Sequence, residues 1–113
     1  MAELVSYTVA RVDDIEPGTA IVVTAGPRRL ALCRAEDGDF YAIDYVCTHD
    51  GGPLGEGDVF GCEIECPRHG ARFDVRTGAV TALPAVFPIA TYPVTVENGE
   101  IRVDVPTQPS WRR

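Results

Sequence analysis

Two short segments of the chain combine cysteine with histidine, which are common ligands of transition metals. Cys47 and His49 are separated by one residue, and Cys66 and His69, separated by two, follow after a gap of sixteen residues. The whole chain has 4 Cys and 2 His, so both histidines lie in these segments. Chance pairing of a scarce cysteine with a scarce histidine in both segments is a poor explanation. These four residues are therefore the candidate metal ligands.

The ligand types are compatible with two kinds of metal centre. Zinc accepts two cysteines and two histidines in a tetrahedral site, but its usual spacing pairs cysteine with cysteine and histidine with histidine. Here each segment offers one thiolate and one imidazole, which suits a two-iron cluster that takes one ligand for each iron from each segment. The pattern favours the iron cluster and leaves zinc as the alternative.

The elements that position these segments are expected to be β-strands. Alternating apolar and polar residues, with frequent Gly and Pro, predict short strands joined by tight turns and no long helix. Asn98-Gly99 suits a two-residue hairpin turn. The chain is expected to form one domain, residues 1–113, with a Gly- and Pro-rich functional insertion at about residues 45–90. The expected strands are 4–12, 19–24, 30–33, 40–43, 92–97 and 100–105.

The insertion resembles the Rieske family in several motifs, which are Cys47-Thr48-His49, Gly52-Pro53-Leu54, Glu56-Gly57, Cys66-Pro67-Arg68-His69-Gly70, Phe73-Asp74, Thr77-Gly78 and Pro84-Ala85. The resemblance implies an all-β fold, a small antiparallel β sandwich with a cluster-binding subdomain at its tip. It implies one [2Fe–2S] cluster, with Cys47 and Cys66 on one iron and His49 and His69 on the other through their Nδ1 atoms. Residues 84–88 would form a third loop over the cluster.

The chain departs from the respiratory branch of that family at informative positions. Respiratory members link their two cluster loops by a disulfide, whereas this chain has residues 50–52 and Arg68 at those places. They also place Ser and Tyr hydroxyls near the cluster, where this chain has Ala71 and Phe73. Hydrogen bonds to the cluster sulfurs raise the reduction potential of the cluster. The absence of these donors therefore predicts a reduction potential near the low end of the Rieske range, about −150 mV.

These departures resemble the soluble ferredoxins of bacterial oxygenase systems. The resemblance implies an electron carrier, not an enzyme, that passes single electrons from a flavin-containing ferredoxin reductase to a terminal aromatic-ring-hydroxylating oxygenase. A Rieske-like small subunit of a nitrite reductase, a ferredoxin of a diiron monooxygenase and a zinc-stabilised binding module remain alternatives. The chain is not expected to be the oxygenase, whose mononuclear iron needs two further histidines, nor the reductase, since no nucleotide-binding glycine motif follows a strand.

The charge balance narrows the class of partner. With 10 basic and 17 acidic residues, the formal net charge is −7. This charge disfavours nucleic acid and anionic membranes and favours a protein partner with a basic docking face. The first residues are acidic rather than basic, and no run approaches the ~18 apolar residues of a membrane span. A cytoplasmic monomer is therefore expected.

Residues outside the ligand pattern are expected to have structural roles. Cys33 and Cys62 are interpreted as small buried hydrophobes. Leu54 and Pro84 could shield the centre from water. Arg68 and Arg72 flank the second histidine and could contact a partner or form ion pairs with nearby carboxylates, namely Asp44, Asp50 or Asp74.

Overall fold

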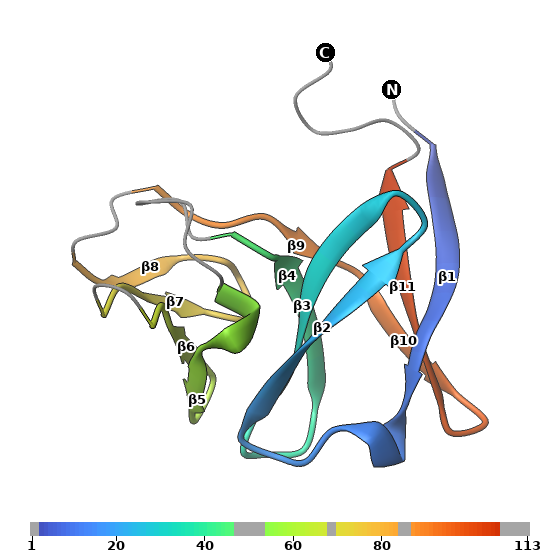
Figure 1. Cartoon of the computed structure of the whole chain (residues 1–113), viewed down its shortest axis with the longest axis horizontal. Coiled ribbons are helices and arrows are strands. Elements are labelled where there is room, and N and C mark those ends of the chain that lie inside the picture. The colour runs from blue at the N-terminus through green and yellow to red at the C-terminus, as the bar shows by residue number, and fades with distance from the viewer. Residues whose placement is uncertain (1–2, 47–53, 68–69, 84–86, 107–113) are drawn as a thin grey trace.

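A computed structural model of the chain describes residues 3–46, 54–67, 70–83 and 87–106. These residues form three sheets in which neighbouring strands are antiparallel (Figure 1). The first sheet has the order β1-β11-β10, the second β2-β3-β4-β9 and the third β5-β6-β7-β8. The strands are β1 (Leu4–Arg11), β2 (Thr19–Ala25), β3 (Arg28–Arg34), β4 (Phe40–Asp44), β5 (Asp58–Phe60), β6 (Glu63–Glu65), β7 (Arg72–Asp74), β8 (Val80–Ala82), β9 (Thr91–Tyr92), β10 (Val94–Glu97) and β11 (Glu100–Pro106).

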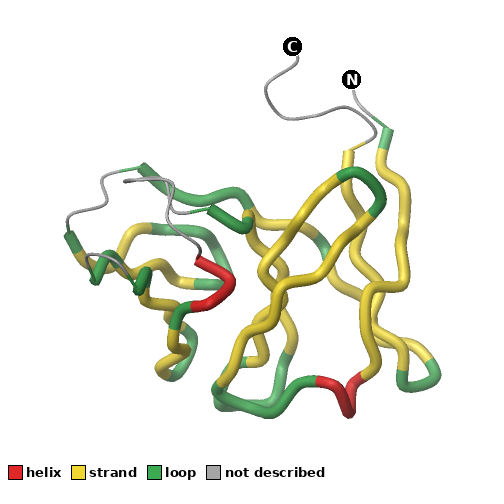
Figure 2. Tube along the Cα trace, in the orientation of Figure 1, coloured by secondary structure: helices red, strands yellow, loops and turns green. Residues whose placement is uncertain are grey.

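The described helical structure is confined to two short 3₁₀ turns, η1 (Val12–Asp14) and η2 (Leu54–Glu56), drawn in red in Figure 2. Strands and connecting loops make up the rest of the described chain. The predicted all-β, antiparallel fold class is therefore confirmed. No helix among the described residues is long and apolar enough to cross a membrane.

The first and second sheets pack face to face as a sandwich. Alternate residues of β11 (Ile101, Val103 and Val105) are buried, and they share one hydrophobic core with Leu30 and Leu32 of β3. This alternation is what a strand with one buried face requires. The scaffold core is therefore formed by side chains that sequence periodicity could identify.

The third sheet packs on the opposite side of the second sheet, at the left in Figure 1. Ala31 and Cys33 of β3 lie in a second core together with Val59, Ile64 and Phe73 of the third sheet. Strand β3 is consequently buried on both faces, which explains its unbroken apolar run from Leu30 to Cys33. Figure 1 shows β3 and β4 between the third sheet and the strands β1, β10 and β11.

The expected strand 92–97 is two strands rather than one. Tyr92 belongs to β9, which pairs with β4, whereas Val94 begins β10, which pairs with β11. Pro93, which has no N–H to donate to a ladder, lies between them where the chain passes from one sheet to the other. The predicted hairpin turn after β10 is confirmed, since Asn98 and Gly99 have φ angles of 54° and 77°.

Candidate metal centre

Cys66 is the one predicted ligand within the described residues; Cys47, His49 and His69 lie outside them. It directly follows β6 and is 1% exposed, within the core that β3 shares with the third sheet. Within the described part of the chain, no three His, Cys, Asp or Glu side chains gather as a metal site. The residues that anchor the two predicted ligand loops do lie within the described part of the chain.

The second ligand loop is closed by the hairpin of β6 and β7. The Cys66 N–H donates to the Ala71 carbonyl at 2.7 Å, and the Gly70 N–H donates to the Cys66 carbonyl at 3.1 Å. Gly70 has a φ of 78°, in the left-handed region that favours glycine. These bonds fix both ends of the loop that contains Cys66 and His69 in sequence.

The first ligand loop is closed in a similar way. The Leu54 N–H donates to the Tyr45 carbonyl at 2.8 Å, across the segment that contains Cys47 and His49 in sequence. Leu54 is fully buried, in the same core as Cys66 and Ala71. One end of the first predicted loop and both ends of the second are thus anchored in one core, although twelve positions separate Leu54 from Cys66 in sequence.

Gly57 explains how closely the two loop anchors approach. Its N–H donates to the Leu54 carbonyl at 3.0 Å, and a Cβ on Gly57 would lie 2.0 Å from the carbonyl oxygen of Glu65. Only a residue without a side chain allows this contact between η2 and the end of β6. The sequence indicated a Gly- and Pro-rich segment here but carried no signal for the backbone approach.

The surroundings of Cys66 fit a thiolate ligand of an iron–sulfur cluster. Cys66 is buried in the same core as the fully buried Leu54, Ala71 and Phe73, so water has little access to it from the side of the described residues. Neither Ala71 nor Phe73, which stand where the respiratory branch is expected to have Ser and Tyr, has a side chain that can donate a hydrogen bond. The buried thiol and its apolar setting are compatible with a cluster of low potential.

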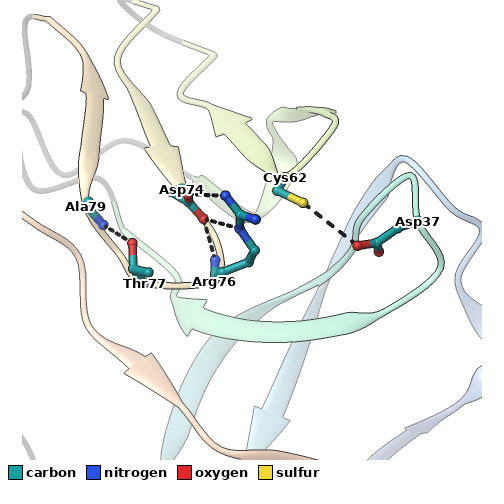
Figure 3. A network of polar contacts seen from close by, with 6 residues as sticks. All are labelled: Asp37, Cys62, Asp74, Arg76, Thr77 and Ala79. Atoms are coloured by element: carbon teal, nitrogen blue, oxygen red, sulfur yellow. Dashed lines mark hydrogen bonds and ion pairs between the residues drawn. The ribbon is translucent and has the colours of Figure 1, made fainter.

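The other described cysteines differ from each other. Cys33 is fully buried, and burial raises the pKa of its thiol to about 12, so its interpretation as a core residue is confirmed. Cys62 is only half-buried, and its Sγ lies 4.0 Å from Oδ2 of Asp37 (Figure 3). It belongs to the turn between β5 and β6 and packs against the edge of the core that contains Ile64 and Cys66, so the prediction of a buried Cys62 is confirmed only in part.

The ion pairs expected of Arg72 are also wrong in detail. Its guanidinium pairs with Glu65 and Glu63, at 3.6 and 3.7 Å, instead of Asp44 or Asp74. Asp74 pairs with Arg76 at 2.9 Å, and this hydrogen-bonded pair holds the pKa of Asp74 below its usual value (Figure 3). These partners depend on strand register, which the sequence did not reveal; Asp50 and Arg68 lie outside the described residues.

Comparison with known proteins identifies the family. Residues 5–93 match the model of the Rieske [2Fe-2S] domain. The chain is 42% identical over 92 residues to the ferredoxin component of the naphthalene 1,2-dioxygenase system of Pseudomonas putida, covering 81% of this chain and 88% of that protein.

Solved structures agree with the family match. The ferredoxin of Sphingomonas yanoikuyae B1 matches with a TM-score of 0.82 and 37% identity, covering 93% of this chain and all (100%) of that one. A chain from a complex of reduced oxygenase and oxidized ferredoxin in carbazole 1,9a-dioxygenase matches with a TM-score of 0.80 and 39% identity. The match covers 86% of this chain and 99% of that chain. These matches show that the chain belongs to the Rieske [2Fe-2S] domain family, whose cofactor is a [2Fe–2S] cluster.

Proposed function

We propose that this chain is the ferredoxin of an aromatic-ring dioxygenase system, an electron carrier rather than an enzyme. It would accept single electrons from a flavoprotein ferredoxin reductase and deliver them to a terminal oxygenase. The relatives that support this proposal are the ferredoxin component of a naphthalene dioxygenase system and the ferredoxin in complex with a carbazole dioxygenase. When bound, the cluster supplies reversible uptake of one electron.

The proposed ligands are Cys47 and Cys66 for one iron and His49 and His69 for the other. The observation that carries this assignment is the convergence of the loop anchors: Leu54, Cys66 and Ala71 are buried in one core. Two loops held at a common base can present their ligands to one cluster, and burial of the base limits the access of water to it. Residues 45–90 are proposed to be the cluster-binding part of one domain that spans residues 1–113.

Electrostatics support the proposed one-electron role. Two ferric ions and two sulfides carry a charge of +2, which two thiolates cancel, so neutral imidazoles leave the oxidised cluster uncharged. The holo-protein would thus change from the formal −7 of the chain to −8 on reduction. A carrier of this charge is suited to basic docking faces on its two partners.

The carrier is proposed to act as a monomer in the cytoplasm. The described Cys33, Cys62 and Cys66 are not in disulfides, which is in keeping with a reducing compartment. Gel filtration of the holo-protein tests the monomer. A stable complex with a large enzyme on purification would instead indicate the nitrite reductase type of subunit.

The decisive experiment compares two cysteines on either side of β6. Cys66→Ser is expected to abolish the visible absorption of the cluster and the EPR signal of the reduced protein, because a proposed iron ligand is lost. Cys62→Ser is the matched control and should retain both signals. A colourless wild-type protein that contains one zinc and no acid-labile sulfide would overturn the proposal.

Reconstitution tests the role of the cluster in electron transfer. The wild-type protein should couple a flavoprotein reductase to product formation by a ring-hydroxylating oxygenase, and neither enzyme should turn over the aromatic substrate when this chain is omitted. Coupling to a diiron monooxygenase but to no ring-hydroxylating enzyme would refute the proposed acceptor.

A further inference from the structure

Arg72 connects three side chains on the outer face of the third sheet. Its Nε lies 3.6 Å from Glu65 Oε2, and its NH1 lies 3.7 Å from Glu63 Oε1. Its guanidinium also stacks over the ring of Phe60, 4.7 Å from the centroid. One cation on β7 thereby holds side chains of β5 and β6, and the planar guanidinium is suited to both kinds of contact.

This cluster of side chains is at the base of the second ligand loop. Glu65 and Arg72 are directly opposite each other in the antiparallel pairing of β6 with β7. Each is the immediate neighbour of a residue that closes the loop, Glu65 of Cys66 and Arg72 of Ala71. The Glu65 carboxylate extends toward the loop itself, since Oε2 is 3.4 Å from the position that a Cβ on Gly70 would take.

Negative charge surrounds Arg72 on this face. Asp58 is directly opposite Glu65 on β5, and Glu63 is directly opposite Asp74 on β7. Like charges in such cross-strand positions destabilise a sheet. Arg76 pairs with Asp74. Among the described residues, the positive charge that contacts Glu63 and Glu65 is that of Arg72. Removing it would leave these carboxylates uncompensated beside the loop.

We propose that Arg72 is a positioning residue for the ligand loop 66–71 and that its positive charge makes the cluster easier to reduce. This inference rests on the proposed function, because it assumes that the loop holds two cluster ligands. Reduction adds a negative charge to the centre, and a nearby cation stabilises that charge more than it stabilises the oxidised state. The cross-strand ion pair also ties together the two residues that flank the loop.

The test measures the midpoint potential and the rate of cluster loss of the isolated holo-protein. Arg72→Gln should shift the potential to a more negative value and accelerate cluster loss, by up to about fivefold if the ion pair contributes at most ~1 kcal/mol. Glu65→Gln should shift the potential in the opposite direction. Arg72→Lys keeps the charge but not the planar fork, so it should restore the potential while cluster loss remains faster than in the wild type.

Arg11 provides a matched control far from the loop. It too is directly opposite a glutamate in an antiparallel pair, Glu100, and its NH1 lies 3.9 Å from that carboxylate. Arg11→Gln removes the same charge from β1 and should leave both the potential and the cluster loss unchanged. An equal shift in Arg11→Gln would show a general charge effect and overturn the assignment to Arg72.

The outcomes separate this inference from the proposed function. If Arg72→Gln has a Rieske EPR signal and the wild-type potential, the inference fails and the electron-carrier proposal stands. If Arg72→Lys fails to restore the potential, the charge-based part of the inference is wrong. If the wild-type protein has no Rieske EPR signal at all, the proposed function itself fails.

Discussion

Replacing Gly57 with alanine is expected to separate the anchors of the two ligand loops. The added Cβ would lie 2.0 Å from the Glu65 carbonyl oxygen and 3.2 Å from the Leu54 carbonyl oxygen. Since Cβ–oxygen contacts below about 3 Å are not tolerated in packed proteins, η2 and the end of β6 must move apart by roughly 1 Å. The contact is between backbones, so no flexible side chain can yield instead.

The expected cost follows from the hydrogen bonds in that region. A movement of this size strains the bonds from Gly57 to Leu54 and from Leu54 to Tyr45. At about 1 kcal/mol for each bond, the free energy of unfolding should fall by about 2 kcal/mol. For a domain of this size, that corresponds to a decrease in Tm of roughly 10 °C.

The Gly57→Ala prediction can be tested with two spectroscopic signals and one control variant. Thermal unfolding followed by far-UV circular dichroism reports the sheets, and visible absorption reports the cluster, which should be lost at a lower temperature than the sheets in Gly57→Ala. Gly61→Ala is the control, because Gly61 has a φ of 60° and no atom lies within 4 Å of the position of its added Cβ. This substitution should lower the free energy of unfolding only by the left-handed backbone strain, about 1–2 kcal/mol, and the protein should retain its cluster. A Gly57→Ala protein that melts with the wild type, or that keeps its cluster until the sheets unfold, would refute the argument.

Three further predictions concern packing, pH and salt. Leu54→Ala should lower the free energy of unfolding by about 2–5 kcal/mol in urea titrations because Leu54 is fully buried, whereas Leu83→Ala, 77% exposed, should have little effect. Burial, together with the hydrogen bond to Asp44, raises the pKa of Tyr92 above its usual value of 10.0. The stability linked to this shift is present below pH 10 and decreases as the pH rises through the folded pKa, so Tyr92→Phe should show a shallower alkaline loss of stability. Finally, the net charge of −7 predicts that electron transfer to both partners slows as ionic strength rises, and a salt-independent rate would contradict steering by basic docking faces.

The general fold was predictable because local signals agreed with each other. Alternation identified β1 and β11, and Asn98-Gly99 identified the turn between β10 and β11 from its tolerance of positive φ. The split was missed because Tyr92, Val94 and Val96 alternate as in one strand, which outweighed the Pro93 between them, while the change of sheet depends on pairing partners that are remote in sequence.

The predicted site depended on a different kind of signal. The scarcity and spacing of Cys and His indicated a metal centre, and the buried setting of Cys66 agrees with that interpretation. The contacts of Arg72 and the exposure of Cys62 could not be predicted in the same way. Both follow from the register and the turn of the third sheet, and short strands of three residues carry too little periodicity to define either.

The two-sided burial of β3 makes this strand a template for both halves of the molecule. Leu30 and Leu32 face the sandwich core, while Ala31 and Cys33 face the core that holds Cys66. A slip of one residue in the pairing of β3 would exchange large and small side chains between the two cores. The proposed cluster-binding part therefore cannot change independently of the sandwich formed by the first two sheets. A substitution on one face of β3 shifts the strand, and this shift alters how the sheet on its other face packs.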